Sequence, residues 1–186
     1  MTALWIVLGV VVIIAVAVAV SYNRFVSQRN LVQESWRQVD VELKRRHDLI
    51  PNLVETVKGY ATHEREVFDA VTRARAAAAA PGSSPAQQGQ QEGILGQALG
   101  RLFAVAEAYP DLKASTNFLE LQRELTETED RIAAGRRFYN ANVRALNTRV
   151  EAVPSNIVAG MFGFSKEEYF EVEDEAVRSA PTVDFS

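Results

Sequence analysis

The 186-residue chain contains no cysteine and only two histidines, His47 and His63. Without cysteine there is no disulfide, thiolate zinc site or cysteine nucleophile. An HExxH zinc motif would need a second histidine at position 67, where the chain has Val67. The pair His47-Asp48 lacks the further ligands of a metallohydrolase, and the glycines near residue 96 lack the Gly-Lys-Ser/Thr of a phosphate-binding loop. We therefore predict no enzymatic activity, no metal and no cofactor.

An overall basic surface is also missing. The chain has 20 basic and 24 acidic residues and a formal net charge of -4. A general nucleic-acid binder has to neutralise phosphates with a basic surface. Nucleic acid is therefore excluded as a general partner.

Charged side chains are absent from the first 23 residues. Residues 3–20, ALWIVLGVVVIIAVAVAV, form an apolar run that as a helix would be about 27 Å long, close to the roughly 30 Å hydrocarbon core. We predict a transmembrane anchor at residues 1–22, with Trp5, Tyr22 and Arg24 at the membrane interfaces. The alternative is a cleaved signal peptide ending near Ala19, but the run has no positive n-region and is longer than a usual h-region.

The flanks of this run predict its orientation. Only the amino terminus carries positive charge before the run, whereas Arg24 and Arg29 follow it. The positive-inside rule then places the N-terminus outside and the rest of the chain in the cytoplasm of a single-pass membrane protein. An extracytoplasmic bundle is the alternative.

Residues 22–80 contain a heptad pattern, which is typical of a long coiled-coil-like helix. The pattern runs through Val32, Trp36, Val39, Leu43, Arg46, Ile50, Leu53, Val57, Tyr60, Glu64, Val67, Val71 and Ala74. Its phase does not change at Pro51, so we interpret this region as one helix that bends at the proline. The alternative is a new helix with Asp48 as N-cap and Pro51 in its first turn.

Pro81, Gly82 and Pro85 end this helix, and we predict a mobile loop at residues 81–91. A second helix is expected from Gln87 or Ile94 to Ala108, and a third from Leu112 to Val153. A short apolar helix follows Pro154. The prediction is an all-α protein in which a transmembrane helix precedes an antiparallel up-and-down bundle at residues 23–162. Residues 163–186 are expected to form an acidic, partly disordered tail in which Tyr169, Phe170 and Phe185 are potential anchors to the bundle.

The stretch RRHDLIPNLVE, residues 45–55, carries most of the candidate interaction residues: Arg45, Arg46, His47, Asp48 and Pro51. Arg46 occupies a heptad position that is otherwise apolar, so it requires an acidic partner, and Glu127 and Glu129 are candidates. The cluster Lys44-Arg45-Arg46 is roughly 33 Å from Tyr22 along a helix, too far to reach lipid from an upright bundle. A partner-binding patch is the alternative to internal pairing. Asp48 is a candidate for bonding the backbone near Pro51.

Two segments of the chain share a short pattern of residues at the same spacing. These are Tyr22-Asn23-x-x-Val26-x-x-x-Asn30 and Tyr139-Asn140-x-x-Val143-x-x-x-Asn147. Asn30 and Asn147 are therefore candidates for hydrogen bonds between helices, although chance similarity of two seam sequences explains the shared pattern equally well.

The motifs RRHDLIPNLV, YPDLKA and FYN, in this order, resemble those of the LemA family of bacterial membrane proteins, and the resemblance covers essentially the whole chain. It implies a single-pass protein with a short extracytoplasmic N-terminus, an intracellular helical bundle and no established enzymatic activity. Some relatives are associated with membrane remodelling in organelle-forming bacteria.

Together these patterns favour a membrane-tethered scaffold or adaptor that self-associates and recruits as yet unidentified membrane or cytoplasmic proteins at the cytoplasmic membrane face. Its lipid contact would be made by residues 3–20. Two alternatives remain: a membrane-shaping oligomer, and an accessory subunit of a membrane enzyme or signalling complex that uses Arg45 to Asp48.

Overall fold

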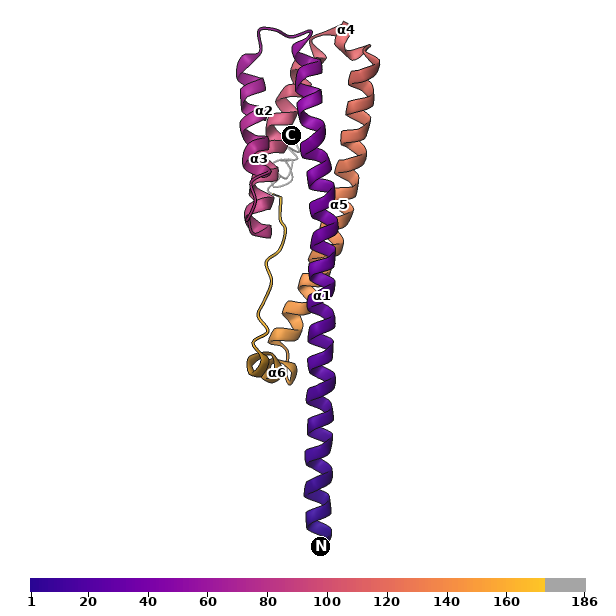
Figure 1. The fold of residues 1–186 in the computed structure, drawn as a ribbon, viewed down its shortest axis with the longest axis vertical. Helices are drawn as coiled ribbons and strands as arrows, with labels where there is room; N and C mark the ends of the chain where they lie inside the picture. Colours follow the sequence, from indigo (N-terminus) through magenta and orange to yellow (C-terminus); the bar gives the residue numbers. More distant parts are fainter. Residues whose placement is uncertain (173–186) are drawn as a thin grey trace, which may run out of the picture.

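The computed structural model describes residues 1–172, and every regular element in this range is a helix. The elements are α1 (Thr2–Lys58), α2 (Arg65–Ala78), α3 (Pro85–Glu107), α4 (Pro110–Lys113), α5 (Thr116–Glu151) and α6 (Ser155–Phe162). The four longer helices alternate in direction, and α6 lies at the end of the bundle from which α1 emerges (Figure 1). The predicted all-α, up-and-down architecture is confirmed.

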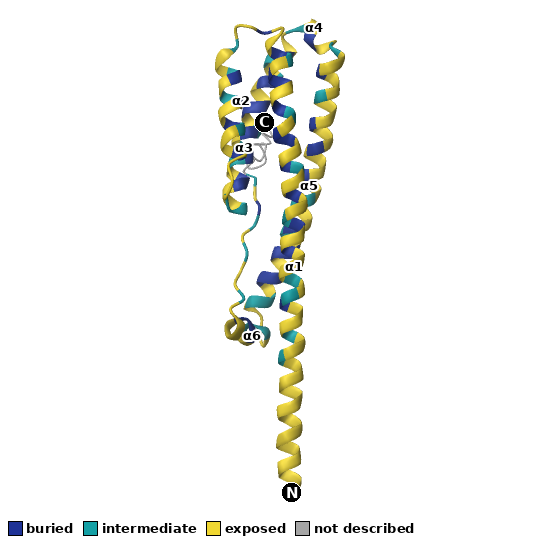
Figure 2. Ribbon diagram, in the orientation of Figure 1, coloured by how far each residue is buried: buried dark blue, intermediate teal, exposed yellow. Residues whose placement is uncertain are grey.

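The first helix is 57 residues long and joins the apolar segment, residues 3–20, directly to the bundle. Residues 1–17 are all exposed, and the first buried residue is Phe25. Figure 2 shows this bare stretch projecting from the bundle. It is long and apolar enough to cross a membrane. Water cannot solvate such a continuous apolar surface favourably, so the stretch requires a lipid or protein environment.

The first helix continues through Pro51, as the heptad phase indicated, and Asp48 caps no new helix. The prediction that it runs on to residue 80 was wrong, because α1 ends at Lys58 and α2 begins at Arg65. Ala61, in the intervening turn, is fully buried, and its N–H bonds to the carbonyl of Val57 at 2.9 Å. The apolar stripe resumes in phase on α2 because both helices face the same core.

The predicted mobile loop at residues 81–91 was also wrong beyond Ser84. Ser84 and Gln87 form a reciprocal capping box, and Pro85 occupies the first turn, where its missing N–H costs nothing. Gln88 and Gly89 are buried. The predicted third helix is divided into α4 and α5 by residues 114–115.

Two hydrophobic clusters fill the bundle. The membrane-distal cluster extends from Ile50 through α2, α3 and α4 to Leu125 on α5. The membrane-proximal cluster contains Phe25 to Leu43 of α1, the second half of α5, and residues from α6 and beyond. The two clusters meet α1 on either side of Arg46 and His47, so a polar layer separates them.

Residues 163–172, here called the strap, leave α6 and run back along the bundle without regular structure (Figure 1). Gly163 has a φ of 71°, a left-handed conformation that glycine adopts without penalty, and it reverses the chain at the end of α6. Phe170 is fully buried, with its ring 5.4 Å from that of Trp36. The expected anchoring by Phe170 is confirmed, and this part of the tail is ordered. Phe185 lies outside the described residues.

Candidate functional site

The polar cluster between the two cores consists of Arg46, His47, Gln88 and Glu92. Glu92 is only 1% exposed. Its Oε2 accepts a 3.1 Å hydrogen bond from Arg46, and its Oε1 lies 2.7 Å from His47 Nε2 and 2.9 Å from the Gln88 amide nitrogen. The same amide donates to the carbonyl of Ala78 at 2.8 Å. The carboxylate therefore has several buried hydrogen-bond partners, as a charge in a protein interior requires.

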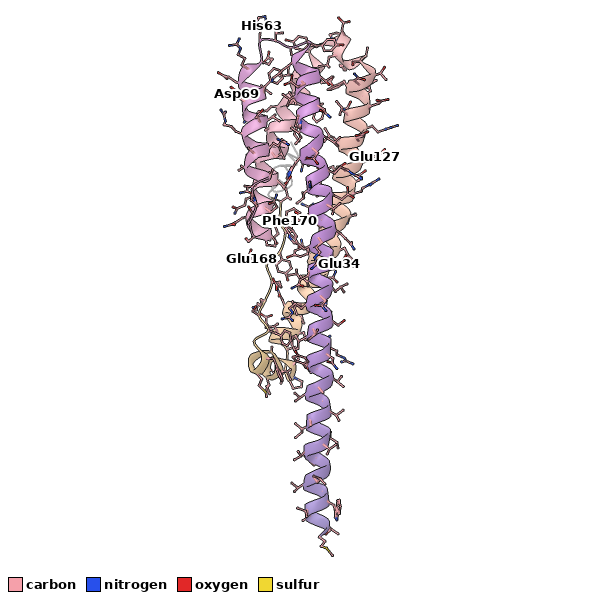
Figure 3. The ribbon with its side chains drawn as sticks, viewed as in Figure 1. Glu34, His63, Asp69, Glu127, Glu168 and Phe170 are labelled. Carbon is pink, nitrogen blue, oxygen red and sulfur yellow. The ribbon has the colours of Figure 1, made fainter. Side chains whose placement is uncertain are left out.

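Arg46 also reaches Glu129, at 3.3 Å, so one of its two predicted partners is confirmed. The predicted pairing with Glu127 was wrong. The Glu127 side chain is 58% exposed and pairs with Arg123 on the same helix. Figure 3 shows Glu127 on α5. Glu92 was missed because the sequence interpretation placed the preceding residues in a loop. The available signal was the Ser84-Pro85-x-Gln87 capping box, which starts the helix early enough to direct Glu92 inward.

Pro51 explains a contact between α1 and α2. A proline has no N–H, so the carbonyl four residues earlier, that of His47, lacks its helical partner. Arg75 of α2 supplies one: its Nε donates to the His47 carbonyl at 2.6 Å. The proline thereby leaves a backbone acceptor one turn earlier in α1 free for docking α2.

The remaining candidates from RRHDLIPNLVE do not join the cluster. Arg45 is exposed and pairs with Glu42 at 3.7 Å, and Asp48 is exposed. His63 is exposed in the turn between α1 and α2 (Figure 3). Within residues 1–172 no group of three or more histidine, aspartate or glutamate side chains is arranged to hold a metal. The buried charged groups Arg46 and Glu92 bond to each other, at 3.1 Å.

A cleft of about 510 Å³ opens beside the cluster, between α3 and α5. Arg46, Glu92 and Glu129 form its polar part, and Leu99, Phe103 and Leu125 form its apolar part. Gly93, Gly96 and Gly100 face it from α3 and keep it open. The strap reaches it through Val172.

Two asparagines of α5 bind the strap through its backbone. Asn140 accepts from the N–H of Phe170 at 2.9 Å and donates to its carbonyl at 3.0 Å. Asn147 makes the same pair of bonds with Glu167, both at 2.9 Å. The seven residues from Asn140 to Asn147 in the helix and the three from Glu167 to Phe170 in the extended strap both cover about 10 Å. The two asparagines are therefore spaced to reach these two backbone positions. The predicted hydrogen bonds between helices through Asn30 and Asn147 were wrong. Asn30 is exposed, and Asn147 bonds to the strap.

Tyr139 adds a third bond from α5 to the strap. Its hydroxyl donates to the carbonyl of Glu168 at 2.8 Å. Burial, followed by the negative charges of Glu167 and Glu168, raises the pKa of Tyr139 to about 12. The phenol therefore stays protonated, and remains a donor, throughout the physiological pH range.

The membrane-proximal end contains the predicted interface residues. Trp5 is 69% exposed near the free end of α1. Tyr22 lies at the junction with the bundle, where its ring is 4.9 Å from Phe162 of α6 and 5.7 Å from Phe164. Arg24 is exposed one turn beyond Val20. An exposed apolar helix bordered by aromatic and arginine residues is the pattern of a membrane-anchored segment.

The fold and these contacts define a membrane-associated helical-bundle protein in which the buried charges of Arg46 and Glu92 are paired. The chain belongs to the LemA family, whose model matches residues 35–185. It is 32% identical over 190 residues to magnetosome protein MamQ 2 of Paramagnetospirillum magneticum, covering 89% of this chain and 70% of that protein. It is 28% identical over 140 residues to protein LemA of Metamycoplasma hominis, covering 74% and 63% of the two chains. MamQ of Magnetospirillum gryphiswaldense is 29% identical over 174 residues, covering 80% and 64%.

Proposed function

We propose that this protein is a membrane-tethered, non-enzymatic helical scaffold that self-associates and recruits other proteins to the membrane surface. The observation that carries this proposal is the continuity of α1, which passes from the apolar segment into the bundle as one helix. A continuous helix transmits position and orientation, whereas a flexible linker would not. The bundle is therefore held upright at a fixed height above the bilayer.

The distribution of polar groups supports a structural role for the interior. The carboxylate of Glu92 and the side chains of Arg46, His47 and Gln88 are bonded to one another. Groups in this state stabilise and specify packing, and a substrate would have to displace those bonds. The surface cleft between α3 and α5 is the proposed place for a recruited protein, because it combines apolar walls with a charged base.

The membrane-proximal half of the bundle supports self-association. Here α1 and α5 carry large apolar side chains on their outer faces: Leu31, Val41 and Phe138 are 43%, 61% and 50% exposed. Contact between copies would bury them. In the proposed topology the N-terminus is outside and the bundle is in the cytoplasm, as the arginines after the apolar segment favour.

The absence of cysteine allows a direct test by single-cysteine crosslinking. Val41→Cys and Phe138→Cys variants in native membranes should form disulfide-linked dimers on mild oxidation. Asp69→Cys, exposed on α2, is the matched control and should remain monomeric (Figure 3). A maleimide that does not cross membranes, applied to intact cells, should label none of these positions.

Recruitment is tested separately with a photo-crosslinking amino acid at Gln97, which lines the cleft and is exposed. A reproducible protein adduct at Gln97 that is absent at Asp69 supports the scaffold. A strictly monomeric protein in detergent and in membranes, with no adduct at either position, would overturn it.

A membrane-shaping oligomer is the second candidate. The relatives named as magnetosome proteins and the exposed apolar side chains of α6 support it. Liposomes of uniform size that acquire tubes or constrictions on reconstitution, and lose them when Ile157 and Met161 are replaced by serine, would favour this function over a passive scaffold.

A further inference from the structure

A groove of about 940 Å³ lies between the end of the apolar segment, the end of α5 and the start of α6. On α1 its wall is formed by Ile13, Val16, Ala17 and Val20, with Arg24 beyond them. Apart from the adjacent pair Val16 and Ala17, these positions follow one another at intervals of three or four residues, so they share one face of the helix. The opposite wall consists mainly of residues 145–158, including Ile157 and Val158 of α6.

The groove has the depth of one membrane leaflet. If residues 3–20 cross the bilayer, their midpoint lies between Val11 and Val12, so Ile13 is close to the bilayer centre. From Ile13 to Arg24 the helix rises about 16 Å. Half of the hydrocarbon core is about 15 Å. The apolar wall therefore covers the acyl-chain region, and Arg24 reaches the headgroup layer.

Two arginines mark the headgroup end of the groove, Arg24 from α1 and Arg149 from α5. Neither forms a salt bridge with any residue in the described range 1–172. The Arg149 guanidinium lies 5.9 Å from the centre of the Phe25 ring, which holds the side chain in place. Guanidinium groups bind phosphate oxygens through paired hydrogen bonds, so this end of the groove is complementary to an anionic headgroup.

The α6 part of the opposite wall is apolar on two sides. Val158 and Ala159 are buried against the bundle, whereas Ile157 and Met161 are 61% and 67% exposed. Val153, just before the helix, is 80% exposed as well. Figure 1 places α6 beside α1 where the bare stretch begins. A short helix with an exposed apolar stripe at this height fits the interface between headgroups and acyl chains.

We propose that this groove binds an anionic phospholipid. Its acyl chains lie along the α1 face, its phosphate is held by Arg24 and Arg149, and α6 lies in the interface as a second membrane contact. The site makes the bundle sensitive to the lipid composition of its own leaflet. This inference rests on the membrane tethering in the proposed function and is independent of self-association and recruitment.

The first test is lipid binding to the full-length protein in detergent, measured by native mass spectrometry with phosphatidylglycerol and phosphatidylcholine. The wild type should retain phosphatidylglycerol preferentially. Each arginine near a membrane surface contributes about a fivefold preference for anionic lipid, so Arg24→Gln/Arg149→Gln should lower phosphatidylglycerol affinity about 25-fold. Phosphatidylcholine binding should be unchanged. Inorganic phosphate at the lipid concentration should not displace the lipid.

The matched control is Arg101→Gln/Arg137→Gln, which removes the same charge from exposed positions on α3 and α5 outside the groove. It should bind phosphatidylglycerol like the wild type. Arg24→Lys/Arg149→Lys keeps the charge but loses the paired hydrogen bonds, so its phosphatidylglycerol affinity should lie between those of the wild type and Arg24→Gln/Arg149→Gln. This order distinguishes lost binding from lost folding. Equal phosphatidylglycerol affinity in the two glutamine variants, or displacement by inorganic phosphate, would overturn the proposal.

The second test places nitroxide labels on single cysteines in liposomes. Labels at Val16 and Ile157 should both be shielded from an aqueous nickel relaxant and accessible to oxygen. A label at Asp69, which is exposed on α2 away from the proposed self-association surface, should show the reverse. If Val16 is shielded but Ile157 behaves like Asp69, the inference about α6 fails alone. If Val16 is also accessible to nickel, the proposed membrane tethering fails with it.

Discussion

The backbone carbonyl of His47 accepts a 2.6 Å hydrogen bond from Nε of Arg75, a side chain 28 residues away on another helix. In an uninterrupted helix this carbonyl would bond to the N–H of residue 51, which is Pro51 and has none. The cost of a proline inside a helix is thus partly offset by a tertiary contact that positions α2. The proline therefore lies inside a continuous helix and not at a helix boundary.

Replacing Arg75 by leucine should leave the His47 carbonyl without a partner and lower the free energy of unfolding by about 1–2 kcal/mol. In a Pro51→Ala background the loss should be smaller, because the new N–H at residue 51 can bond to the same carbonyl. Urea unfolding of the detergent-solubilised chain, followed by helical circular dichroism, measures both. Arg73→Leu, at an exposed position on the same helix, is the control. Equal losses in the two backgrounds would refute this role of the proline.

Replacing Glu92 by glutamine should destabilise the bundle by about 2–3 kcal/mol. Removing one partner of a buried ion pair usually costs about 3–5 kcal/mol, and Glu129 remains available to compensate Arg46 in part. Glu129→Gln should cost less than about 1 kcal/mol, since that carboxylate is 56% exposed. Thermal unfolding of both variants checks the order. A larger effect from Glu129 would show that Glu92 is not the principal partner.

Gly89→Ala should release the strap from α3. A Cβ at this position would overlap the backbone carbonyl of Glu171, so the main chain of the strap would have to move. Hydrogen exchange at the Phe170 and Glu167 N–H groups should accelerate at least tenfold, since both bonds to α5 depend on the position of the strap. Gly100→Ala, where a Cβ meets nothing within 4 Å, is the control and should leave exchange unchanged. Unchanged protection in Gly89→Ala would mean that α3 does not position the strap.

Alkaline pH should loosen the strap through Tyr139. The pKa of this phenol is raised from 10.0 to about 12, so the native state retains its proton where the unfolded state loses it. The contribution is fully present below pH 10 and is lost as the pH rises to about 12. Two pKa units correspond to about 3 kcal/mol. Unfolding at pH 9 and pH 11.5 measures this loss, and Tyr139→Phe should show a correspondingly smaller decline. An equal decline in both proteins would assign it to other groups.

Heptad phase predicted helix continuity correctly at Pro51 and incorrectly at Gly59. At Pro51 one hydrogen bond is lost and replaced by Arg75, so the helix persists. After Lys58 the turn buries Ala61 and returns α2 to the same core, so the apolar stripe resumes in phase although the helix has ended. The heptad phase indicates which face of a helix meets the core. Two successive helices that pack on the same core can therefore share one phase.

The candidate site was only partly predictable for a related reason. A lone arginine between Leu43 and Ile50 on an apolar stripe requires an acidic partner, and Glu129 was among those predicted. Glu92 is 46 residues from Arg46, and its orientation depends on where α3 begins. The position of the strap was harder to predict. An acidic segment without hydrophobic periodicity does not indicate which asparagines will bind its backbone.

The sequence by itself determined the apolar segment, the helical class and the seam of α1, because hydrophobic periodicity and length act locally along the chain. The resemblance to the LemA family came from the motifs RRHDLIPNLV, YPDLKA and FYN. Only the tertiary structure decided which carboxylate compensates Arg46, which side chain replaces the bond lost at Pro51, and where the strap and α6 lie. Those outcomes depend on contacts between residues far apart in the chain. Their energies depend on burial and geometry, which exist only once the helices have packed.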